Sequence, residues 1–444
     1  MYDLLIRGGT IAGPMGFDGA DIGVREGRIT AIGALENGSA AEVFDAKGLH
    51  VLPGVIDTQV HFREPGNAHK EDLETGSRGA VLGGVTAVFE MPNTYPPTTS
   101  RIALEDKLAR ARGRMHCDYA FYIGATPENI GALAELERAP GVAGVKAFLG
   151  SSTGPLLLDK EVDIAAAFRA GRRRMAVHSE DEARLRERKS LALPGKPATH
   201  PVWRDPESAR LSTERVLRLA RTAGRRVHVL HVTTADELPL LAGMRDLATV
   251  ETTPQHLTLA APECYERLGT YAQMNPPIRE AAHREALWRA VREGLIDVIG
   301  SDHAPHTRSE KDGEYPATPS GMPGVQTLVT VLLDHVAAGR MSLARFIDLT
   351  SHGPARIFGI AGKGRIARGY DADFTIVDLG AKRRIENSWV ASRCGWTPFD
   401  GMTTTGWAVA TIIRGRIVMR EGALPIPAAG APVRFVETGA SSGA

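Results

Sequence analysis

The sequence predicts an α/β protein, a (β/α)8 barrel of the TIM type joined to a small β-sandwich domain that both chain ends form. Three observations lead to this prediction. In the middle of the chain, short apolar runs alternate with amphipathic segments such as 205–223 and 279–293. At both ends, apolar and polar residues alternate around glycines, as in short antiparallel strands. An open doubly wound sheet is the alternative, but no Gly-x-Gly-x-x-Gly motif follows an early strand.

The domain boundaries follow from the same patterns. Neither chain end has enough strands for an independent sheet, so we expect residues 1–52 and 365–436 to pair into one β domain. The barrel is expected within residues 53–364, and residues 437–444, which are mostly small and polar, are expected to form a disordered tail. The eight expected barrel strands are 55–57, 85–90, 118–123, 144–149, 175–178, 227–232, 248–252 and 297–302.

Composition excludes several classes of protein. Lys and Arg number 53 against 52 Asp and Glu, so no basic surface for nucleic acid or an anionic membrane is predicted. No apolar run reaches the roughly 20 residues of a membrane helix, and the N-terminus lacks a signal-peptide pattern. Three scattered cysteines form neither a disulfide framework nor a CxxC site. We therefore expect a cytoplasmic protein that acts on a small molecule.

Polar side chains recur at the C-terminal ends of the expected strands. A barrel gathers these ends on one face, where the active sites of barrel enzymes lie. Imidazole and carboxylate groups are typical zinc ligands, so their recurrence at strand ends predicts a metal centre. The candidate ligands are Gln59, His61, Lys146, His178, His231 and Asp302.

Lys146 interrupts the apolar run 144–149. Burying an unpaired ammonium group costs several kcal/mol or drives the loss of its proton. A neutral amine in such a place can react with carbon dioxide, and the resulting carbamate could bridge two cations. The alternative is a lysine that extends to solvent at the tip of its strand.

Asp302 lies in the segment Ser301-Asp-His-Ala-Pro-His306. A carboxylate beside a metal and its water can ligate the metal, accept a proton from the water and return it to a leaving nitrogen. Asp302 is therefore the candidate catalytic acid and base. The alternative is a polar turn that follows a strand.

A second group of residues predicts a pocket for a substrate carboxylate. Arg63 could hold a carboxylate through two hydrogen bonds, with Asn93 and His306 as further donors. For Arg63 alone, a structural ion pair with Glu64 or Asp72 is an open alternative.

Two loops are candidates for further substrate contacts. Asn275 lies on a proline-rich loop after the seventh strand and could add a hydrogen bond. The loop 150–154 follows Lys146 and predicts either a mobile flap or an ordinary turn.

These motifs resemble the amidohydrolase superfamily, and most of all its dihydroorotases. The resemblance spans nearly the whole chain. Its most specific motifs are Val60-His-Phe-Arg-Glu-Pro-Gly66, Glu90-Met-Pro-Asn-Thr94, Met274-Asn-Pro-Pro277 and Ser301-Asp-His-Ala-Pro-His306. By this resemblance, His61 would bind the more buried metal, His178 and His231 the more exposed one, and Lys146 would be the carboxylated bridge.

The same resemblance implies a substrate and a cofactor. The cofactor would be Zn2+, one or two ions per chain, in a homo-oligomer, either a dimer or a tetramer. The reaction would be the reversible conversion of dihydroorotate to N-carbamoyl-aspartate in pyrimidine biosynthesis, with Asp302 as acid and base. Ser320 and Gly321 match a segment whose backbone contacts the substrate. Hydantoin or allantoin hydrolysis is the alternative, although those relatives generally lack the equivalents of Arg63 and Asn93.

Gln59 is the main departure from the family pattern, because it replaces the first histidine of a His-x-His pair. An amide oxygen is a poorer zinc donor than an imidazole. The buried metal could bind weakly, be absent, or be held by the oxygen of Gln59. This departure also supports a rival hypothesis, a non-catalytic scaffold that would partner aspartate transcarbamoylase.

Overall fold

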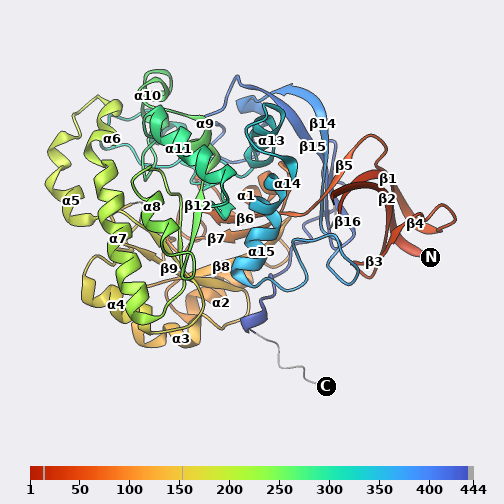
Figure 1. The fold of residues 1–444 in the computed structure, drawn as a ribbon, viewed down its shortest axis with the longest axis horizontal. Coiled ribbons are helices and arrows are strands. Elements are labelled where there is room, and N and C mark those ends of the chain that lie inside the picture. The colour runs from red at the N-terminus through yellow and green to blue at the C-terminus, as the bar shows by residue number, and fades with distance from the viewer. Residues whose placement is uncertain (14–15, 153, 439–444) are drawn as a thin grey trace.

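The structure is a computed structural model that describes residues 1–13, 16–152 and 154–438. It has two parts: a barrel surrounded by helices, and a β-sheet at one side of the barrel that is built from both chain ends (Figure 1). The predicted fold class is therefore confirmed.

The barrel consists of eight parallel strands that follow one another in chain order. Both faces of these strands are buried, which explains why they read as nearly continuous apolar runs. The barrel closes between its last and first strands through a pairing of Val60 with His303, and the His61 N–H donates to the His303 carbonyl at 2.7 Å. The strands are β6 (Val55–Val60), β7 (Val85–Glu90), β8 (Asp118–Gly124), β9 (Val142–Phe148), β10 (Met175–His178), β11 (Val227–Val229), β12 (Ala248–Thr252) and β13 (Val298–Ile299).

Helices cover the outside of the barrel (Figure 1). The longest, α7, begins after Asp205, whose side chain accepts a hydrogen bond from the Ser208 N–H, and it ends at Gly224, where φ is +65°. The α-helices are α1 (Leu73–Leu82), α2 (Arg101–Ala111), α3 (Leu133–Leu136), α4 (Glu161–Arg169), α5 (Glu182–Glu187), α6 (His200–Trp203), α7 (Pro206–Ala223), α8 (Leu238–Ala242), α9 (Pro254–Thr258), α10 (Glu263–Leu268), α11 (Ala281–Arg292), α12 (Arg308–Lys311), α13 (Leu328–Ala337), α14 (Leu343–Ile347) and α15 (Gly353–Phe358).

The second part is one hydrogen-bonded sheet of eight strands, in the order β16-β15-β14-β5-β1-β2-β3, with β4 paired to β1. The two chain ends meet where β5 and β14 pair antiparallel, with Val51 opposite Ile376. The strands are β1 (Tyr2–Gly13), β2 (Gly16–Arg25), β3 (Arg28–Gly33), β4 (Ala40–Asp45), β5 (His50–Pro53), β14 (Phe374–Arg384), β15 (Thr403–Ile413) and β16 (Arg416–Arg420).

A buried ion cluster joins this sheet to the barrel. The Lys363 ammonium lies 2.7 Å from Asp118 at the start of β8, and 2.5 Å and 3.2 Å from Asp373 and Asp371 just before β14. Burial alone would lower the pKa of Lys363, but the three carboxylates outweigh it and the pKa is raised. The cluster therefore holds a lysine in its charged form at the junction of the two parts.

The observed strand bounds explain the placement of two site residues. β7, β10 and β12 match the predicted bounds, whereas β11 ends at Val229 and β13 at Ile299, earlier than predicted. His231 and Asp302 lie just beyond these ends with φ of +37° and +45°, a conformation that a β-strand cannot contain. Both side chains are therefore carried on the loops that follow these strands.

At the C-terminus, ordered structure continues into the segment predicted to be a tail. A short turn spans Val436–Thr438, and Glu437 forms an ion pair with Arg226 at 2.7 Å. Residues 439–444 of the predicted tail lie outside the described residues. Within the described part of the chain, no helix combines the length and the apolar character needed to span a membrane.

Candidate functional site

The predicted site residues meet at the carboxyl ends of the barrel strands. They line one cavity with about 350 Å³ of empty space, counting the part open to solvent, with the exception of His306, which lies directly behind its wall. Cavity-lining residues from the prediction are Gln59, His61, Arg63, Asn93, Lys146, His178, His231, Asn275, Asp302, Ser320 and Gly321.

Gln59, His61 and Asp302 form one end of the site. The Gln59 amide donates to Asp302 Oδ1 at 3.0 Å, and His61 Nε2 lies 3.2 Å from the same oxygen. His61 Nδ1 lies 2.7 Å from Asn93 Oδ1, an acceptor, so the ring proton is assigned to Nδ1. The lone pair on Nε2 therefore faces the Asp302 carboxylate, an arrangement that a cation between the two atoms would stabilise.

His178 and His231 form the second pair. His178 Nδ1 lies 3.1 Å from His231 Nε2, while His178 Nε2 donates to Glu180 at 2.9 Å. Burial alone would raise the pKa of Glu180, but the Arg204 guanidinium and His178 hold it well below its usual range. Burial lowers the pKa of both histidines, so they are neutral, which is the form that binds metals. A carboxylate behind a ligating histidine is the usual way to orient its ring.

Lys146 lies in the same cavity and is almost completely buried. Its Nζ has no hydrogen-bond partner among the described residues and lies 4.6 Å from the centre of the Phe148 ring. Burial lowers the pKa of Lys146 to about 7, although Asp302 opposes the shift. The lysine does not extend to solvent, and a good part of it is the neutral, nucleophilic amine near neutral pH.

The backbone is strained at three of these positions. The φ angle is +62° at Arg63, +37° at His231 and +45° at Asp302. Such conformations cost about 1–3 kcal/mol for a residue other than glycine, and they cluster at functional sites because the surrounding structure must enforce them.

A metal ion fits this donor set only when Lys146 and Gln59 contribute to it. Among the described residues, no three His, Cys, Asp or Glu side chains form a cluster that could hold a metal by themselves. Two ligands of a tetrahedral zinc ion lie roughly 3.3 Å apart, close to the spacing within the pair His178–His231 and within the pair His61–Asp302. Buried polar atoms without partners supply the missing donors: Lys146 Nζ, which would become a carbamate, and Gln59 Oε1.

Arg63 forms the cationic end of the cavity, and His306 lies directly behind it. Arg63 is 4% exposed, its Nε donates to the Pro305 carbonyl at 3.1 Å, and its Nη2 lies 3.2 Å from His306 Nε2. Burial lowers the pKa of Arg63 to about 10, so the side chain remains charged at neutral pH. Among the described residues Arg63 forms no salt bridge.

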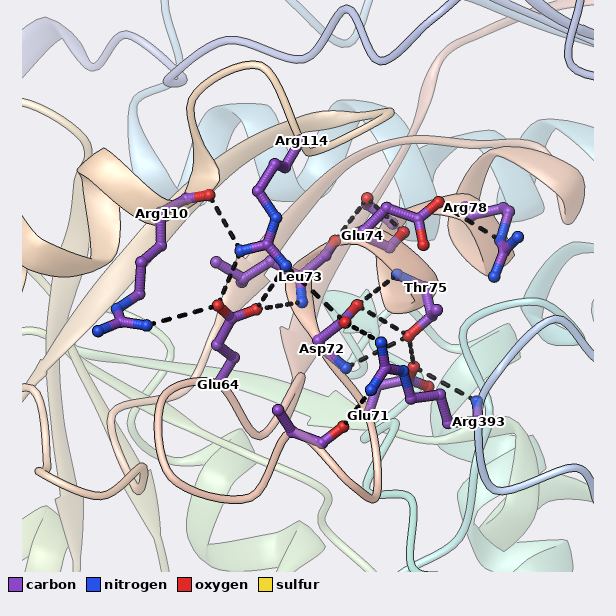
Figure 2. A network of polar contacts seen from close by, with 12 residues as sticks. Glu64, Glu71, Asp72, Leu73, Glu74, Thr75, Arg78, Arg110, Arg114 and Arg393 are labelled. Carbon is purple, nitrogen blue, oxygen red and sulfur yellow. Dashed lines mark hydrogen bonds and ion pairs between the residues drawn. The ribbon is translucent and has the colours of Figure 1, made fainter.

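The two acidic neighbours of Arg63 are paired with other arginines (Figure 2). Glu64 lies 2.7 Å from Arg114 and accepts a hydrogen bond from the backbone N–H of Leu73 at the start of α1. Asp72 caps α1 and pairs with Arg393. The alternative in which Arg63 forms a structural ion pair with Glu64 or Asp72 is therefore wrong, and its guanidinium is left to the cavity.

Asn275, Ser320 and Gly321 also line the cavity, and the Ser320 carbonyl lies 3.1 Å from His306 Nε2. The buried His200 lies 3.0 Å from Asn275 Oδ1 and orients that amide. Lys311 donates to the carbonyls of Pro319 and Gly321 at 2.9 Å and 3.3 Å, and thereby holds the Ser320 segment in place.

The loop 150–154 approaches the cavity, which Ser152 lines. The Ser151 N–H donates to Glu182 at 2.6 Å, and its carbonyl accepts from Arg204 at 2.8 Å. Residue 153 of the predicted flap lies outside the described residues. The same Arg204 pairs with Glu180, so it links this loop to the orientation of His178.

Several residues near the site were absent from the prediction. Phe148 and Ala304 line the cavity, each two positions after a predicted residue, and the two-residue period of a strand could have indicated Phe148. Four further residues contact the side chains or loops of the site from behind: Glu180, Arg204, Lys70 and Lys311. Their positions depend on loop conformation, and no pattern in the sequence indicates them.

The fold and the cavity define the class of protein: a (β/α)8 barrel with imidazole, carboxylate and lysine side chains gathered at the carboxyl ends of its strands. A dihydro-orotase-like family model matches residues 48–152, and an amidohydrolase family model matches residues 204–418. The chain belongs to the amidohydrolase family and is a hydrolase, as its resemblance to the dihydroorotases predicted.

Individual relatives support this assignment. A dihydroorotase of Halobacterium salinarum is 38% identical over 90% of this chain and 93% of its own length. An allantoinase of Rubrobacter xylanophilus is 37% identical over 98% of both chains. The solved structure of an L-hydantoinase (dihydropyrimidinase) from Arthrobacter aurescens superposes with a TM-score of 0.92 at 29% identity, over 98% of this chain and all of that one.

Proposed function

We propose that the chain is a zinc-dependent dihydroorotase that interconverts dihydroorotate and N-carbamoyl-L-aspartate in pyrimidine biosynthesis. The observation that carries the proposal is Arg63, a buried guanidinium in the cavity wall without a salt bridge among the described residues. An unpaired buried charge is unfavourable, so the cavity favours a ligand that brings an anion. Dihydroorotate carries a carboxylate at neutral pH, whereas hydantoin and allantoin are uncharged.

The proposed metal site uses the donors already described. His178 and His231 would hold one zinc ion, His61, Asp302 and the Gln59 oxygen would form a second, weaker position, and Lys146 as its carbamate would contribute to both. When bound, zinc supplies a Lewis acid that polarises a carbonyl and activates water near neutral pH.

The protein side chains would orient the substrate and move its proton. Arg63, Asn93 and His306 would hold the carboxylate, which fixes the ring relative to Asp302. Asp302 would accept the proton of the attacking water and donate it to the ring nitrogen as the amide bond breaks. Asn275 and the backbone of Ser320 and Gly321 would make further contacts with the ring.

Initial rates with L-dihydroorotate, hydantoin and allantoin test the proposal. We expect turnover of dihydroorotate, and an Arg63→Met variant should lose about 30-fold or more in kcat/KM, because a partner of a charged hydrogen-bonded pair contributes at least 2 kcal/mol. Arg114→Met is the matched control, since Arg114 pairs with Glu64 outside the cavity. Robust hydantoin or allantoin cleavage without dihydroorotate turnover would defeat the proposal.

Elemental analysis of the purified protein tests the metal site and the scaffold hypothesis together. Two zinc ions per chain would support a binuclear site, and one would support a site reduced by Gln59. No zinc and no turnover would favour the non-catalytic scaffold. The cytoplasmic location and the homo-oligomeric state stay predictions.

A further inference from the structure

Lys70 lies behind the cationic end of the cavity, on the turn that follows Arg63. Its ammonium lies 3.2 Å from His306 Nδ1 and 2.6 Å from Glu310. Its side chain is 12% exposed, and it does not line the cavity. Any effect of Lys70 on a ligand in the cavity is therefore expected to pass through His306.

The hydrogen-bond partners of His306 select one tautomer. An ammonium group has donors and no acceptor, so Lys70 requires a lone pair on His306 Nδ1. The Ser320 carbonyl, an acceptor 3.1 Å from Nε2, requires a proton on that nitrogen. Both contacts favour the neutral ring with its proton on Nε2. Burial, together with Arg63, Lys70 and Lys311, holds the pKa of His306 well below its usual range, so the ring stays neutral.

This tautomer places two donors side by side. Arg63 Nη2 and the His306 Nε2–H group lie 3.2 Å apart, and neither can accept a hydrogen bond from the other. An anionic oxygen placed beside them would accept from Arg63 and would share the His306 Nε2–H group with the Ser320 carbonyl. With the opposite tautomer, His306 Nε2 would accept from Arg63 without a ligand, and the hydrogen bond to the Ser320 carbonyl would be lost.

We propose that Lys70 is a positioning residue that fixes the His306 tautomer, so that Arg63 and His306 together donate to one oxygen of the substrate carboxylate. The proposal rests on the proposed carboxylate substrate. It adds Lys70 as the residue that prepares Arg63 and His306 to bind that carboxylate. In the absence of Lys70, Arg63 would donate a hydrogen bond to His306, and this bond would compete with binding of the ligand.

Kinetics of a double-mutant cycle test the route through His306. We expect Lys70→Met to raise KM for dihydroorotate about 10- to 100-fold, the value of one hydrogen bond to a charged group, with kcat changed less than about 3-fold. Lys70→Arg, which keeps a donor, should recover most of the loss. In a His306→Ala background, Lys70→Met should have almost no further effect. The proposal would be overturned if the KM changes of Lys70→Met and His306→Ala multiplied in the double variant, or if Lys70→Met left KM unchanged.

A measurement without substrate separates this proposal from the proposed function. The 15N chemical shifts of the ring nitrogens of His306, assigned by comparison with His306→Ala, report which nitrogen carries the proton. We expect the proton on Nε2 in the wild type and in the control Glu310→Gln, and on Nδ1 in Lys70→Met. The same tautomer in Lys70→Met and the wild type would overturn the proposal, even if the enzyme turned over dihydroorotate.

Discussion

Replacing Lys146 with methionine should stabilise the metal-free protein. The Lys146 amine is buried without a hydrogen-bond partner in the described structure, and burial lowers its pKa from 10.5 to about 7. At about 1.4 kcal/mol for each tenfold change in a proton equilibrium, this difference corresponds to about 5 kcal/mol of lost stability when the amine is protonated. A methionine of similar length removes that loss and buries an apolar chain in its place.

The gain should depend on pH in a defined direction. The folded-state pKa lies below the unfolded one, so between pH 7 and about 10 the unfolded chain binds the extra proton, and wild-type stability rises with pH. Below pH 7 the full penalty of the buried charge is present. The advantage of Lys146→Met should therefore be several kcal/mol at pH 6 and should shrink toward zero near pH 10.

Urea unfolding of chelator-treated protein in carbon dioxide-free buffer, at pH 6, 7.5 and 9, measures this effect. Lys189→Met is the control, because Lys189 is exposed. Adding zinc and bicarbonate should reverse the order of stability, since both bind the folded wild type. If wild type and Lys146→Met show the same pH dependence without metal, Lys146 is not an unpaired buried amine and the carbamate argument fails.

Three further predictions concern the metal site and the domain junction. Gln59→His should raise the zinc content per chain by elemental analysis, because an imidazole is a better zinc ligand than an amide, and unchanged content with full activity would show that Gln59 is no deficit. Glu180→Gln should weaken zinc binding about 10- to 100-fold in competition with a chelator, whereas Glu182→Gln, which does not contact His178, should bind as the wild type does; equal affinities would contradict the orienting role. Lys363→Met should lower the apparent free energy of unfolding by about 3–5 kcal/mol at pH 7, because it leaves buried carboxylates unpaired, while the control Arg434→Met should cost less than about 1 kcal/mol. The difference between Lys363→Met and the wild type should narrow as pH falls through the carboxyl range, and a constant difference would argue against unpaired charge.

The alternation of strand and helix segments was sufficient to predict the barrel and the convergence of residues from distant strands. Contacts set by loops were not predictable in this way. Glu64 lies next to Arg63 in the sequence, yet packing of α2 brings Arg114 to it. Arg393, more than 300 residues away in the sequence, forms the ion pair with Asp72. The contact of Lys70 with His306 likewise depends on two loops that meet only in the folded chain.

The closure of the barrel has a consequence for the whole molecule. In the described part of the chain β13 and β6 share no ladder, and the join between them consists of the isolated pairing of Val60 with His303 and of side-chain hydrogen bonds, from the Ser301 N–H to Asp57 and from Gln59 to Asp302. Gln59 and His61 lie on one side of this join and Asp302 on the other, so a ligand that binds all three would also hold the first and last strands of the barrel together. Occupancy of the site should thus slow amide hydrogen exchange at His61, whose N–H crosses that join.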